Sequence, residues 1–73
     1  MAVGQVTLKL YYATEAHART AVDELRARSL HAEVVRAQKG WAAAVHVQAG
    51  DADLPRIRSK IEAIAAQAVS ALG

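Results

Sequence analysis

The chain contains no cysteine and no phenylalanine. The first absence excludes disulfides, thiolate metal sites and cysteine nucleophiles, and it leaves the redox compartment undecided, with the cytoplasm as the default. The second leaves few large side chains for a core, because 18 of the hydrophobic residues are alanine. A chain of 73 residues is close to the smallest size at which one core suffices. We therefore expect one domain, residues 1–73. We also expect a homodimer or another bound partner to contribute to its stability.

Strong net charge and long apolar runs are missing as well. Nine Lys and Arg against seven Asp and Glu give a net charge of +2, without the dense basic stripe typical of a nucleic-acid binder. Residues 1–10 lack the basic start and apolar run of a signal peptide. No run approaches the roughly 18 apolar residues that a membrane-spanning helix needs. We expect a soluble protein without a membrane segment.

Residues 5–12 alternate polar and apolar side chains. This is the period of a strand with one buried face. The side predicted to be buried carries Val6, Leu8, Leu10 and Tyr12.

A helix is predicted to follow, with Thr14 as its N-cap, because the hydroxyl can accept from free backbone N–H groups of the first turn. Its apolar stripe has the spacing of an amphipathic helix and consists of Ala18, Ala21, Val22 and Leu25. The helix should end near Arg28 and Ser29. No glycine stands there, so Ser29 must adopt a strained turn or the helix end must fray.

Residues 32–48 predict a β-hairpin that turns at Lys39-Gly40, since Gly40 can adopt the positive φ of a tight turn. The register that follows from this turn places Gln38 opposite Trp41, Val34 opposite Val45 and Glu33 opposite His46. Trp41 is predicted to pack under the second helix.

That second helix should begin at about Asp53 or Leu54, with Asp53 as N-cap and Pro55 in the first turn, where a missing N–H is tolerated. Its predicted apolar stripe consists of Leu54, Ile57, Ile61, Ile64, Ala68 and Leu72.

The order of elements is thus β-α-β-β-α. A right-handed crossover followed by a hairpin predicts an α+β, ferredoxin-like two-layer sandwich. Its three-stranded sheet has the strand order 1-3-2, with both helices on one face. The 5–12 strand would keep a free edge, where a strand from a partner or a second copy can add.

The sheet face opposite the helices is predicted to be unusually apolar. We expect it either to be an ordinary solvated surface or to contact another protein or a second copy. The residues predicted to bind the partner are Lys9, Tyr11, Val35, Ala42, Ala44 and His46.

The sequence gives little support for a catalytic site or a metal site. His17, His31 and His46 fall on different elements, with no i, i+4 pair and no clustered carboxylates, so no metal is predicted. The serines and threonines lack an activating context, and the glycines form no phosphate-binding loop. We predict neither an enzyme nor a cofactor. His46 is expected to pair with Glu33 across the hairpin.

Nucleic-acid binding is an alternative, because some RNA-binding modules stack bases on an open sheet face. Tyr11 beside Lys9 could serve single-stranded RNA in this way. A short basic cluster of Arg56, Arg58 and Lys60 at the start of the second helix is either a solvated face or a contact for an anion.

From Ala16 onward the chain resembles the ribonuclease E inhibitor B family of regulators. The resemblance rests on a first helix followed by a strand, a Gly-Trp hairpin, and a final long helix that follows Asp-Leu. These segments read HARTAVDELRARSLHAEVV, KGWAAAVHV and GDADLPRIRSKIEAIAAQAVSALG. The family implies a ferredoxin-like fold and regulation of an RNA-degrading enzyme through protein contact. Ser29 stands where the family has glycine, and no functional residue is transferred.

The topology and the Gly-Trp hairpin also look like the SPOR domains, which implies peptidoglycan binding as a further alternative. The segment Tyr12-Ala13-Thr14 does not match the aromatic strand end of those domains. The preferred interpretation is therefore a regulatory or adaptor module that binds another protein.

Overall fold

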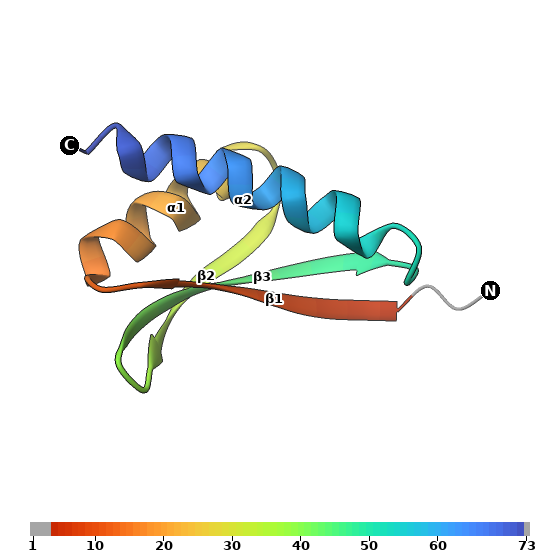
Figure 1. Cartoon of the computed structure of the whole chain (residues 1–73), viewed down its shortest axis with the longest axis horizontal. Helices are drawn as coiled ribbons and strands as arrows, with labels where there is room; N and C mark the ends of the chain where they lie inside the picture. The colour runs from red at the N-terminus through yellow and green to blue at the C-terminus, as the bar shows by residue number, and fades with distance from the viewer. Residues whose placement is uncertain (1–3, 73) are drawn as a thin grey trace.

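The computed structural model describes residues 4–72. The elements follow in the order β1 (Gly4–Tyr12), α1 (Glu15–Ala27), β2 (His31–Ala37), β3 (Gly40–Ala49) and α2 (Leu54–Ser70). Both helices lie on the same side of the sheet (Figure 1). The predicted α+β two-layer sandwich is confirmed.

The sheet has the order β1-β3-β2, with β3 antiparallel to both neighbours. This is the predicted strand order. Within residues 4–72, β1 and β2 each pair on one side, so both are edge strands. Only the edge of β1 was predicted from the sequence to be free.

The predicted register of the hairpin is wrong by two residues. Ala37 pairs with Gly40, and Val34 pairs with Ala43 instead of Val45. Gly40 does adopt a positive φ, of 138°, but as the first residue of β3, so the turn lies at Gln38 and Lys39. Because a shift of two residues preserves the alternation of side chains, every residue stays on its predicted face.

Both ends of α1 satisfy their backbone groups locally. The Thr14 hydroxyl accepts from the N–H of His17 at 3.3 Å, as predicted for the N-cap. At the other end Ser29 has a φ of 66°, and the N–H of Leu30 donates to the carbonyl of Leu25 at 3.0 Å. This is a Schellman ending with serine at the left-handed position. The strained turn expected at Ser29 is therefore present.

The ends of α2 differ from the prediction. Asp53 has helical backbone angles and makes no capping hydrogen bond through its side chain, because a capping residue needs a more extended conformation. Its carboxylate instead pairs with Arg56 at 3.0 Å. Leu72, predicted on the apolar stripe, lies beyond the helix and is 52 % exposed.

The core lies mainly between α1 and the sheet. Four side chains of α1 are buried, namely Ala18, Ala21, Val22 and Leu25, whereas α2 buries only Ile61 and Ala65. The backbone of α1 approaches all three strands and α2, whereas the contacts of α2 are chiefly with α1. α2 therefore rests on α1 and leaves space between itself and the sheet. Within residues 4–72 neither helix could cross a membrane.

Trp41 does not pack under α2 as predicted. It is only half-buried and lies outside the cluster of residues that forms the core. The guanidinium of Arg36, its partner in the hairpin register, lies 5.6 Å from the centre of the indole ring. This cation–π contact replaces the expected cover by the helix.

Candidate functional site

The predicted partner-binding residues do share the sheet face opposite the helices. The register places Lys9 and Glu33 on either side of Ala44. Tyr11 and Val35 lie in the same way on either side of Ala42. The longer side chains of the two edge strands therefore flank the small residues of β3.

This arrangement changes which of these residues a partner could touch. Ala42 and Ala44 are only 1 % and 3 % exposed, whereas Tyr11 is 69 % exposed and Lys9 is also exposed. The alanines form the floor of the open face and offer almost no surface of their own. A contact on this face would be made mostly by the flanking side chains.

His46 joins the three strands on the same face. Its Nδ1 lies 3.0 Å from the Thr7 hydroxyl on β1, and its Nε2 lies 3.6 Å from a carboxylate oxygen of Glu33 on β2. The pairing with Glu33 was predicted, but it runs diagonally, because His31 is the residue opposite His46. The contact with Thr7 was missed, since it depends on the register of β1.

Tyr11 is the exposed aromatic residue among those described. Tyr12 and Trp41 are half-buried and face the helix side of the sheet. A base-stacking platform normally uses two or three exposed rings. The described face offers one, beside Lys9.

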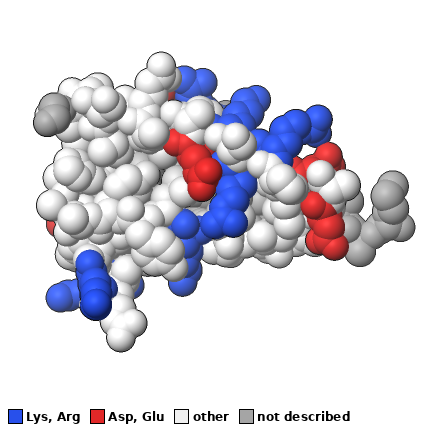
Figure 2. Space-filling view, viewed as in Figure 1, with Lys and Arg blue, Asp and Glu red and all other residues white. Residues whose placement is uncertain are grey.

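A groove runs between β1 and α2, and we call it the β1 groove. It has a volume of about 650 Å³. β1 contributes Lys9, Leu10, Tyr11 and Tyr12, and α2 contributes Arg58, Glu62, Ala66, Val69 and Ser70. The C-terminal half of α2 carries no charged residue, and Figure 2 shows a corresponding uncharged area on that side of the molecule. The groove therefore lies beside the unpaired edge of β1 and is largely apolar at one end.

The three residues of the basic cluster predicted at the start of α2 do not form one continuous basic patch. Arg56 pairs with Asp53 at 3.0 Å, and Arg58 pairs with Glu62 at 3.6 Å. Lys60 makes no ion pair within residues 4–72 and lines a different space.

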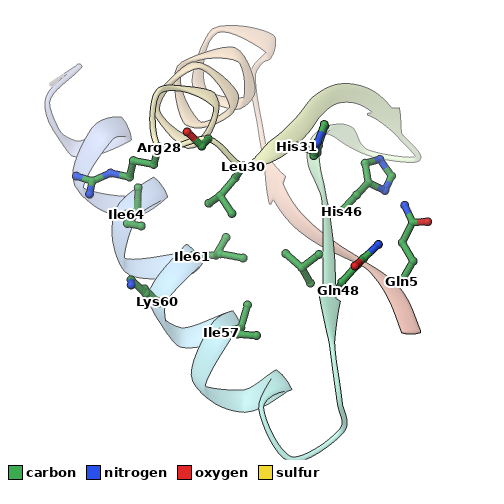
Figure 3. A pocket seen from close by; sticks show the side chains of 12 residues that line it. Gln5, Arg28, Leu30, His31, His46, Gln48, Ile57, Lys60, Ile61 and Ile64 are labelled. Atoms are coloured by element: carbon green, nitrogen blue, oxygen red, sulfur yellow. The ribbon is translucent and has the colours of Figure 1, made fainter. Parts of the chain in front are cut away.

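That space lies between the N-terminal half of α2 and the sheet, and we call it the isoleucine cleft. Its volume is about 830 Å³, and its apolar wall consists of Leu30, Val47, Ile57, Ile61 and Ile64. In Figure 3, Ile57 and Ile61 point from α2 into the space and Leu30 points toward them. His46, Gln48 and Gln5 lie on the other side of the strand in that view. The isoleucines were predicted from the sequence only as part of the apolar stripe of this helix.

Titratable groups and metal ligands give little further information about the β1 groove or the isoleucine cleft. Burial raises the pKa of the Tyr12 hydroxyl in the β1 groove above its usual value. Among residues 4–72, no three His, Asp or Glu side chains gather in a way that could hold a metal ion.

Comparison of the chain with protein-family models, with curated proteins and with solved structures finds no match.

Proposed function

We propose that this chain is a protein-binding adaptor, without catalytic activity of its own, that accepts an extended strand on the outer edge of β1. The observation that carries the proposal is the β1 groove beside that edge. Backbone N–H and C=O groups of an edge strand can pair with an added strand. Side chains of the added strand that face the helices would enter the groove, where Leu10, Tyr12 and Val69 are half-buried.

The edge of β1 suits strand addition better than the edge of β2. Charged side chains protect an edge strand against pairing. β1 carries a single one, Lys9, over nine residues. β2 carries Glu33 and Arg36, in addition to His31, over seven. β1 is therefore the longer and less protected edge.

A second copy of the chain can supply the added strand. If two β1 strands pair antiparallel about Leu8, Lys9 stands opposite Thr7 and Leu10 stands opposite Val6. Like charges do not face each other in this register, and the apolar side chains stay on the helix side. The result is a continuous six-stranded sheet. A foreign partner with one alternating strand could use the same edge, and the RNA-degrading enzyme that the resemblance implies would be such a partner.

Light scattering over a range of concentrations tests the proposal. We expect the mass of the wild-type chain to rise from 7.7 kDa toward twice that value. Ala66→Arg places a charge in the β1 groove and should keep the chain monomeric. Ala63→Arg is the matched control, since Ala63 is exposed on the same helix but does not line the groove.

The same experiment can contradict the proposal. A wild-type chain that stays at 7.7 kDa throughout would exclude self-pairing. A dimer that Ala66→Arg leaves intact would exclude the groove as the contact. Val35→Arg then tests the open sheet face, and circular dichroism shows whether each variant has kept its fold.

A further inference from the structure

We propose that the isoleucine cleft binds a medium-chain aliphatic carboxylate, with the chain between α2 and the sheet and the carboxylate at Lys60. The volume of about 830 Å³, which includes the space beside Gln5, His46 and Gln48, lies within the range of about 300–1,000 Å³ typical of small-molecule sites. This site is separate from the edge of β1 and does not depend on strand addition.

The part of the wall between α2 and the sheet is aliphatic and incompletely covered, whereas polar side chains line the rest of the space, namely Gln5, Ser29, His31, His46 and Gln48. Ile57, Ile64 and Leu30 pack against the core but remain only half-buried, because α2 contacts α1 more than the sheet. Val47 on β3 and Ile61 on α2 form the deeper part and are buried. An unbranched alkyl chain would bury the remaining apolar surface without requiring any polar partner inside.

The charges around the cleft are of one sign. Among residues 4–72, Lys60 and Arg28 line the cleft, and no Asp or Glu lines it. Arg28 makes an exposed pair with Glu24 at 3.4 Å, and such pairs contribute little. Lys60 has no carboxylate partner within residues 4–72. An anionic head group therefore complements this rim, and a cationic one does not.

A series of hexanoate, octanoate and decanoate, each below its micellar concentration, tests the apolar part of the site. Each methylene that enters the cleft should raise the affinity about three- to fourfold. Isothermal titration calorimetry measures the affinities. An affinity independent of chain length would overturn the proposal, as would the absence of binding by decanoate.

Methyl NMR locates the bound chain. All three isoleucines of the protein, Ile57, Ile61 and Ile64, line the cleft, so isoleucine labelling reports on this site alone. With leucine labelled as well, Leu30 should shift with decanoate, whereas Leu10 in the β1 groove should not. Shifts confined to Leu10 would place the ligand elsewhere and contradict the proposal.

Two variants test the head group and the cleft. Lys60→Gln should weaken decanoate binding about two- to fivefold and leave the binding of decanol unchanged. Arg56→Gln is the matched control, because Arg56 is exposed one turn earlier on the same helix but does not line the cleft. Ile57→Trp should fill the opening and abolish binding. Equal affinities of wild-type protein for decanol and decanoate would refute the role of Lys60.

An anionic bilayer also presents aliphatic chains and negatively charged head groups. Sedimentation with vesicles of anionic phospholipid separates the two sources, and we expect the protein to stay in the supernatant. Co-sedimentation that decanoate does not compete away would show a membrane surface contact instead of a site for a free carboxylate.

Discussion

The N–H of Leu30 donates to the carbonyl oxygen of Leu25 across Ser29, whose φ of 66° lies in the left-handed region. Leu25 is completely buried, and Leu30 packs against the same core. The turn at Ser29 therefore directs the chain from α1 back over the core into β2. Arg26 supports the turn, since its Nε donates to the carbonyl of Ala32 at 2.8 Å.

Ser29→Gly should stabilise the protein by about 1 kcal/mol, because glycine adopts the left-handed conformation without the penalty of a Cβ atom. Urea unfolding followed by circular dichroism measures the change in the free energy of unfolding. Ser59→Gly is the control, since Ser59 lies exposed within α2 and the change should destabilise by about 0.5–1 kcal/mol. A Ser29→Gly protein that unfolds at lower urea would contradict the assignment of this turn.

Gly40→Ala should destabilise the protein by about 1–3 kcal/mol. A Cβ atom at Gly40 would lie 2.6 Å from the carbonyl oxygen of Tyr12, at a φ of 138° that alanine disfavours. Gly4→Ala provides the comparison, because a Cβ atom there meets no neighbour within 4 Å among residues 4–72. Thermal unfolding of both variants checks the difference, and equal melting temperatures would show that the close approach is absent.

Leu25→Ala should cost about 2–5 kcal/mol, the range for removing a large buried aliphatic side chain. Leu25 is 0 % exposed, in a core that contains few side chains of its size. Leu72→Ala changes the same side chain where it is 52 % exposed, and its effect should stay within about 0.5 kcal/mol. Chemical denaturation distinguishes the two. A mild effect at Leu25 would mean that α1 does not anchor the core.

Tyr12 should make the protein less stable at high pH. Because burial raises the pKa of its hydroxyl, the folded state holds this proton more tightly than the unfolded state. The contribution is complete below the usual tyrosine pKa of about 10 and is lost as the pH rises through the folded-state value. The free energy of unfolding of Tyr12→Phe should therefore decline less than that of wild type between pH 9 and pH 12. Equal declines in the free energy of unfolding of the two proteins would contradict this expectation.

The elements were predictable from the sequence because each has a simple period. The alternation in β1 and the stripe Ala18, Ala21, Val22 and Leu25 in α1 place side chains without any knowledge of tertiary contacts. The hairpin register was not predictable in the same way. Gly40 was correctly expected to have a positive φ, but whether such a residue lies in the turn or begins the strand depends on its approach to Tyr12.

The candidate sites were harder to predict than the fold. Alternation places Ala42 and Ala44 on the open face, but their low exposure depends on the longer residues that flank them on β1 and β2. The β1 groove and the isoleucine cleft both depend on the height of α2 above the sheet. That height is set by packing against α1, and no pattern within α2 indicates it.

The packing of α2 on α1 also affects local stability. Only Ile61 and Ala65 of α2 are buried, against four side chains of α1, and its approaches to the strands are few. Partial unfolding requires the least free energy where the fewest apolar contacts must break. Detachment of α2 should therefore precede global unfolding, so amide hydrogens of this helix should exchange with solvent faster than those of α1 and β3.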